Sequence, residues 1–99
     1  MNEKRILEGE VERYLREEVE RLGGECPKFL SEYKRGWPDR IVMLPGGVQV
    51  WVETKRPVGG RLSSMQLVAH EKLRRLGQRV YVAYTRQQVQ LLLAALLEE

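Results

Sequence analysis

The sequence is poor in the residues that build soft-metal sites and covalent cross-links. It contains one cysteine, Cys26, and one histidine, His70, so neither an intramolecular disulfide nor a Cys-rich zinc site can form. A metal ion would therefore be held by carboxylate and carbonyl oxygens, which favour Mg²⁺, Mn²⁺ or Ca²⁺. Cys26 itself is predicted to be a small core residue.

Long apolar runs are also missing. No stretch approaches the roughly 20 apolar residues that a membrane-spanning helix needs, and the charged segment from Met1 to Arg5 lacks the apolar region of a secretion signal. We therefore expect a cytoplasmic protein with no membrane partner. At 99 residues, 42% of them hydrophobic and 31% charged, the chain is expected to form one globular domain over residues 1–99.

The charge is modest in sum but uneven along the chain. The net charge is +3, and between residues 28 and 61 the acidic residues are only Glu32, Asp39 and Glu53. The basic residues of the same stretch are Lys28, Lys34, Arg35, Arg40, Lys55, Arg56 and Arg61. An electropositive middle segment is compatible with nucleic acid as a partner.

The pattern of apolar residues predicts an α/β domain. Helical spacing indicates helices over residues 3–22, 63–76 and 85–97. Strands are predicted at 40–44, 48–55 and 79–84, and Pro27 makes the segment 26–30 an edge strand at best. The order is helix, three strands, helix, strand, helix, which predicts a central mixed four-stranded sheet flanked by helices.

The two middle strands read as a β-hairpin around Pro45-Gly46-Gly47. A three-residue loop pairs Leu44 with Val48, and continuing this register places Asp39 opposite Glu53. Directly opposed residues share a face, so two like charges would meet there unless a cation lies between them. Lys55 follows on the same face as Glu53. A two-residue turn would instead place Arg40 opposite Glu53, an ordinary cross-strand ion pair.

Two further residues have open interpretations. Glu10 lies on or beside the apolar stripe of the first helix. A carboxylate that is buried there is costly unless it is paired or metal-bound. The equally open alternative is that Glu10 lies at the edge of the stripe and its carboxylate reaches water. Gln66 follows Ser63 by three residues, which is the spacing of a helix capping box.

These residues together resemble a known family. Gly36-Trp37-Pro38-Asp39 followed by Glu53-Thr54-Lys55 resembles the signature of the PD-(D/E)xK nucleases. With Glu10 before it and the segment Gly60–Gln66 and Leu73–Gly77 after it, the pattern resembles the VRR-NUC (virus-type replication-repair nuclease) branch, in a minimal stand-alone form. Such minimal members resemble Holliday-junction resolvases, which act as two-fold dimers.

The resemblance implies a restriction-endonuclease-like fold and a Mg²⁺- or Mn²⁺-dependent DNA endonuclease that acts on structured or branched DNA in replication, repair or recombination. It implies a catalytic set of Asp39, Glu53, Lys55, Glu10 and Gln66. Asp39, Glu53, the backbone carbonyl of Thr54 and Glu10 would bind the metal, and Lys55 would position the attacking water or stabilise the transition state. Gln66 matches a family active-site position, beside its role as a cap.

Further residues are candidates for contact with DNA. Lys34, Arg35, Arg56 and Arg61 are expected to contact phosphates. Tyr33 and Trp37 are candidates for base stacking, and packing of Trp37 against the sheet edge is favoured. His70 is expected to lie at the surface, with contact to the substrate as the alternative.

The last helix carries a wide apolar arc, which indicates either a dimer interface or a well-buried terminal helix. For the whole protein, a DNA-binding module without turnover and a purely structural α/β domain are the alternatives to a nuclease. In the structural alternative, Asp39 and Glu53 would pair with Arg40 and Lys55.

Overall fold

The computed structural model describes residues 3–30 and 34–99, and side chains from residue 9 onward within them. The described elements, in chain order, are α1 (Glu3–Arg21), β1 (Arg40–Leu44), β2 (Val48–Thr54), α2 (Ser64–Arg75), β3 (Val80–Ala83) and α3 (Arg86–Leu97). These bounds agree with the predicted helices and with the three predicted strands to within about two residues. None of the described helices is long and apolar enough to cross a membrane.

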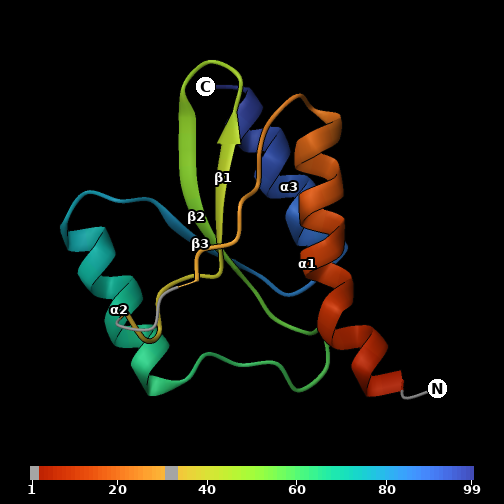
Figure 1. Cartoon of the computed structure of the whole chain (residues 1–99), viewed down its shortest axis with the longest axis vertical. Coiled ribbons are helices and arrows are strands. Elements are labelled where there is room, and N and C mark those ends of the chain that lie inside the picture. The colour runs from red at the N-terminus through yellow and green to blue at the C-terminus, as the bar shows by residue number, and fades with distance from the viewer. Residues whose placement is uncertain (1–2, 31–33) are drawn as a thin grey trace.

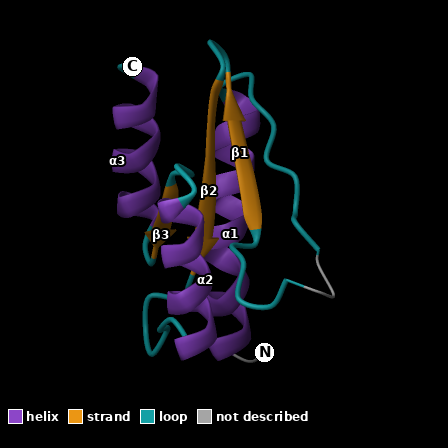
Figure 2. Ribbon diagram, turned by 90° about the vertical axis from the view of Figure 1, so that its left-hand side faces the viewer, coloured by secondary structure: helices purple, strands orange, loops and turns teal. Residues whose placement is uncertain are grey.

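The sheet is mixed, and β2 is its central strand. β1 pairs with β2 antiparallel, whereas β3 pairs with β2 parallel. Helices α1 and α3 lie side by side over one face of the sheet, and α2 lies on the other (Figure 1). The turned view shows the same three layers, with the β1–β2 hairpin extending beyond β3 (Figure 2). The predicted α/β architecture with flanking helices is confirmed.

The predicted four-stranded sheet is wrong for the described residues, because the segment 25–29 makes isolated bridges to β1 and no regular strand. Glu25 and Met43 exchange two backbone hydrogen bonds, at 2.9 Å each, and the amide of Ile41 donates to the Pro27 carbonyl at 3.1 Å. Pro27 has no amide hydrogen to return that bond. The ladder is therefore interrupted midway along the segment.

The two faces of β2 bury different clusters. Val50 and Val52 face the core formed with α1 and α3, where Leu15 and Leu93 are also buried. Trp51 faces α2 and packs with Leu73 and Val80, with Phe29, Trp37 and Ile41 against this second cluster. This alternation is the one predicted from the period of two along the strand, and it assigns Glu53 to the face that α2 covers.

The wide apolar arc of α3 is mostly used inside the domain. Val89, Leu93 and Leu96 are buried, whereas Leu91 and Leu97 are 64% and 48% exposed. The terminal helix is thus well packed. Leu91 and Leu97 are the part of the arc that the domain leaves uncovered.

Candidate active site

The β1–β2 hairpin brings Asp39 and Glu53 together. Leu44 pairs with Val48 and Arg40 with Val52, as the three-residue loop predicts, so Asp39 stands one position beyond the ladder and level with Glu53. Gly46 and Gly47 have φ of +93° and +83°, the conformation that such loops require. The two carboxyl groups lie close enough to repel each other electrostatically.

The alternative in which Arg40 pairs with Glu53 is wrong. The register sets Arg40 opposite Val52. The Arg40 guanidinium instead donates to the Glu12 carboxylate, with an Nε to Oε2 distance of 2.9 Å, and to the Cys26 carbonyl at 2.8 Å. Arg40 therefore ties α1 to the edge of the sheet and leaves the Asp39–Glu53 pair to other partners.

Glu53 is buried to an extent unusual for a carboxylate, with 1% of its surface exposed. Desolvation and the neighbouring Asp39 carboxylate together raise the pKa of Glu53 to about 8, although the ammonium of Lys55 opposes the shift. The Lys55 Nζ lies 3.8 Å from Glu53 Oε2, whereas Oε1 has no hydrogen-bond partner. A buried polar atom without a partner is rare in folded proteins, and a hydrogen-bond donor or a cation would satisfy this oxygen.

His70 lies beside this pair, and the expectation that it sits at the surface is wrong. It is 1% exposed, its Nε2 lies 3.9 Å from Glu53 Oε1, and neither ring nitrogen has a hydrogen-bond partner. Burial, together with the charges of Arg74 and Lys55, lowers the pKa of His70. The helical spacing of His70 from Gln66, Ala69 and Leu73 was the available signal, because these four positions form the face that α2 turns toward the sheet.

The start of α2 closes the site from one side. The loop at Gly36 approaches α2 so closely that a Cβ there would lie 2.5 Å from the Met65 carbonyl oxygen. The Ser63 hydroxyl accepts from the Gln66 amide at 3.1 Å, and Gln66 Oε1 accepts from the Ser63 amide at 2.9 Å. The capping box is therefore confirmed, while the proposed contact of Gln66 with substrate stays a prediction.

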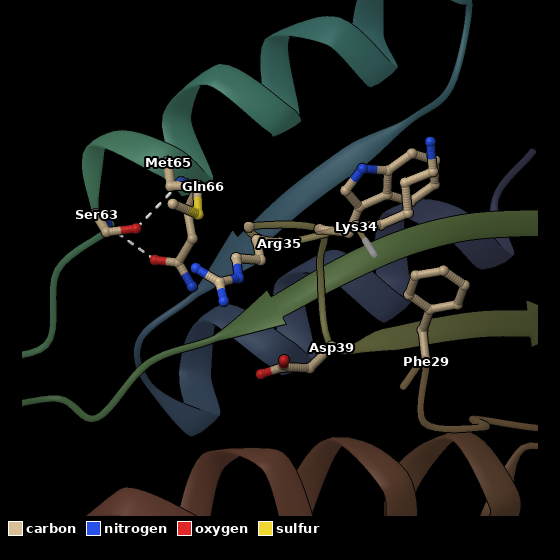
Figure 3. A pocket seen from close by; sticks show the side chains of 9 residues that line it. Phe29, Lys34, Arg35, Asp39, Ser63, Met65 and Gln66 are labelled. Atoms are coloured by element: carbon tan, nitrogen blue, oxygen red, sulfur yellow. Dashed lines mark hydrogen bonds between the residues drawn. The ribbon is translucent and has the colours of Figure 1, made fainter. Parts of the chain in front are cut away.

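Between these elements lies a cavity of about 270 Å³, lined by residues that include Asp39, Gln66, Lys34 and Arg35. Figure 3 shows the side chains of Arg35 and Gln66 directed toward the space above Asp39, with the hydrogen bonds of Ser63 beside them. The cavity thus combines a carboxylate with cationic and amide donors. Cationic and amide donors of this kind suit the binding of a phosphate group.

The other predicted nucleic-acid contacts are spread around this cavity. Arg61 is exposed and Arg56 is half-buried in the loop after β2, and neither lines the cavity. Trp37 packs against Phe29 and Trp51, with ring centroids 5.5 Å apart in both cases, which confirms the packing interpretation. Tyr33, the other stacking candidate, lies outside the described residues. Cys26 is buried as expected.

Comparisons with known proteins decide the family. No protein-family model matches the sequence. A protein of Acyrthosiphon pisum secondary endosymbiont phage 1 named "Putative nuclease p44" is 43% identical over 77 residues, covering 78% of this chain and 82% of the phage protein. A solved structure described as "VRR_NUC domain" is similar with a TM-score of 0.81 and 38% identity, covering 88% of this chain and 94% of that one. The chain belongs to the VRR-NUC family of nuclease domains.

Within this VRR-NUC domain, Glu10 has a partner other than the carboxylate pair. Its Oε1 lies 2.5 Å from Nη2 of Arg86, at the start of α3, and the Arg86 guanidinium also lies over the ring of Tyr14. This ion pair with Arg86 supplies the partner that one of the two interpretations of the sequence requires for the Glu10 carboxylate. A metal-binding role for Glu10 stays a prediction, and it would require release from Arg86.

The residues of the site fit a hard divalent cation. In the described part of the chain, no group of three or more His, Cys, Asp or Glu side chains is arranged to hold a metal ion. The Asp39–Glu53 pair supplies two carboxylates, one with a buried unpartnered oxygen. Mg²⁺ is commonly held by one or two carboxylates, with waters and substrate phosphate completing its octahedron.

Proposed function

We propose that this VRR-NUC domain is a Mg²⁺- or Mn²⁺-dependent DNA endonuclease, with Asp39, Glu53 and Lys55 as its cleaving centre. The supporting observation is the buried Glu53 carboxylate beside the half-buried Asp39, because two neighbouring acids resist ionising together without a cation. Asp39 and Glu53 would hold the ion, and the backbone carbonyl of Thr54 would be a further ligand. A bound Mg²⁺ or Mn²⁺ would polarise the scissile phosphate and lower the pKa of a coordinated water.

The ammonium of Lys55 is the natural group to act on the phosphate. Its side chain is 21% exposed and lies on the same side of the sheet as Glu53, at the end of β2. From there it would orient the attacking water or stabilise the negative charge that develops on the phosphate oxygens. Arg35 would hold the adjacent phosphate from inside the cavity.

Gln66 is proposed to serve both as a cap and as a phosphate contact. Its carbonyl oxygen is used by the Ser63 amide, so only its NH₂ group can reach a ligand in the cavity. The first turn of α2 adds its unpaired amides and the positive end of the helix dipole to the same place. Glu10 would complete the metal shell only after exchanging its ion pair with Arg86.

The resemblance to the family supports a proposal for the substrate and the assembly. We propose structured or branched DNA in replication, repair or recombination as the substrate, with Arg56 and Arg61 contacting its phosphates. A homodimer would form through α3, where Leu91 and Leu97 are exposed. Such a dimer would place one active site on each of two DNA strands, which suits a branched substrate. We also propose a cytoplasmic location.

The test is cleavage of labelled branched and linear DNAs in Mg²⁺, Mn²⁺ or EDTA by the wild type and by Lys55→Met. We expect cleavage in either metal, none in EDTA, and a loss of roughly 100-fold or more in the variant, the size seen when one electrostatic donor is removed. Lys28→Met is the matched control, because Lys28 is half-exposed and pairs with Glu12 away from the cavity.

The same panel separates the alternatives. Salt-sensitive DNA binding without cleavage would indicate a binding module. Absence of both would indicate a structural domain. Cleavage that survives in EDTA or in Lys55→Met would contradict the proposed centre.

A further inference from the structure

A second groove lies next to the cavity of the candidate active site. It has a volume of about 540 Å³ and runs between the loop that carries Trp37 and the part of α2 from Ser64 to Lys72. Its lining includes Lys34, Arg35, Trp37, Met65, Val68 and Lys72. Four of these, Lys34, Arg35, Trp37 and Met65, also line the cavity that contains Asp39. A strand held at Asp39 can therefore continue directly into the groove.

The groove combines an apolar floor with a cationic rim. Met65 and Val68 are 50% and 70% exposed, and Trp37 provides an aromatic wall. Lys34, Arg35 and Lys72 supply three cations, and the described residues that line the groove include no carboxylate. Lys34 also lies over the Trp37 ring, with its Nζ 5.8 Å from the ring centroid. The groove thus offers apolar contact and positive charge within the same space.

This combination distinguishes between possible occupants. Bases within a duplex are stacked on each other and cannot present their faces to Met65 and Val68. Unpaired nucleotides expose those faces while keeping their phosphates, and both features find partners here. An apolar peptide would fill the floor but would not use the positive charge of the rim.

We propose that the groove binds unpaired nucleotides of the substrate strand, immediately beside the scissile phosphate. The proposal rests on the proposed nuclease function and narrows it, because the preferred substrate carries a single-stranded arm at the cut. Such an arm places its bases on Met65 and Val68 and its phosphates on Lys34, Arg35 and Lys72. A blunt duplex makes only the phosphate contacts.

The experiment measures binding in EDTA by fluorescence anisotropy, so that cleavage does not enter. The probes are a blunt hairpin duplex and the same duplex with a single-stranded thymidine arm. The groove variant is the double substitution Met65→Gln, Val68→Gln. Its control is the double substitution Leu67→Gln, Leu76→Gln. These two residues of the same helix are 55% and 65% exposed, and they line neither the active-site cavity nor the groove.

We expect the wild type to prefer the armed duplex. The groove variant should lose about tenfold in affinity for it, because the bases would no longer bury two apolar side chains, and should bind the blunt duplex within about twofold of wild type. The control should match wild type on both probes. Lys72→Gln should lower the salt dependence of armed-duplex binding by about one unit of slope.

Equal wild-type affinity for the two probes would overturn the proposal and leave the groove to a different partner, such as a protein segment. An unchanged preference in the groove variant would overturn it too. The outcome is separable from the proposed nuclease function. If Mg²⁺ supports no cleavage but the wild type still prefers the armed duplex, only the nuclease function fails. If cleavage occurs but the groove variant cuts both substrates like wild type, only the groove proposal fails.

Discussion

Glu53→Gln removes the buried charge while keeping the shape of the side chain. In the metal-free protein the pKa of Glu53 is raised from 4.5 to about 8 by burial and by the Asp39 carboxylate. A raised folded-state pKa means that the group's contribution to stability is fully present below pH 4.5 and is lost as the pH rises through about 8. Glutamine cannot ionise, so the variant escapes this loss.

The size of the loss follows from the shift. One pKa unit corresponds to about 1.4 kcal/mol, so ionisation of Glu53 removes up to about 5 kcal/mol by pH 8 and above. That is a large part of the roughly 5–15 kcal/mol that stabilises a typical domain. In EDTA we therefore expect Glu53→Gln to melt at least about 5 °C above wild type at pH 9, with little difference at pH 5.

A bound divalent cation should reverse the order of the two melting temperatures at high pH. The ion favours the ionised carboxylate, so Mn²⁺ should raise the melting temperature of the wild type increasingly between pH 6 and pH 9, and should leave Glu53→Gln unchanged. The assay is thermal unfolding followed by circular dichroism across this pH range, with Mn²⁺ or EDTA. Glu71→Gln is the control, because Glu71 is exposed and pairs only with Arg75 on its own helix among the interactions described.

Two results would refute the reasoning. One is a Glu53→Gln protein that melts below wild type at pH 9 in EDTA, which would mean that the ionised carboxylate stabilises the fold. The other is equal stabilisation of wild type and variant by Mn²⁺, which would place the metal elsewhere.

Three further substitutions test the surroundings of the pair. Gly36→Ala should destabilise the protein by at least about 2 kcal/mol in denaturant unfolding, since φ is +84° and the new Cβ would lie 2.5 Å from the Met65 carbonyl oxygen; a change below 0.5 kcal/mol would contradict the close approach. Ser63→Ala and Gln66→Ala should each lower the free energy of unfolding by about 1 kcal/mol, because each removes part of the helix cap. Only Gln66→Ala should also slow cleavage. Equal cleavage rates in the two variants would show that Gln66 acts only as a cap. His70→Leu should stabilise the fold by about 1 kcal/mol because two unpartnered buried nitrogens disappear. It should also lower the cleavage rate about tenfold or more, because the imidazole would no longer orient the Glu53 carboxylate. An unchanged cleavage rate would show that His70 has no role in the site.

The carboxylate pair was predictable from the sequence, because every feature that creates it is local. The glycines after Pro45 fix the hairpin loop, the loop fixes the register, and the period of two along β2 assigns Glu53 and Lys55 to one face. A shift of one residue would have moved Arg40 into the place of Asp39. The sequence also determined the cap at Ser63, since a capping box needs only residues three apart.

Long-range packing decided the rest. That His70 is buried beside Glu53 depends on which face of the sheet α2 covers, and no local spacing encodes that choice. Glu10 met Arg86 because α1 and α3 pack side by side, although 76 residues separate them in the chain. The segment 25–29 failed to become a fourth strand because Pro27 withholds one amide from β1. Sequence periodicity reports which side of an element is apolar, whereas the partner of each side is set by the packing of elements distant in the chain.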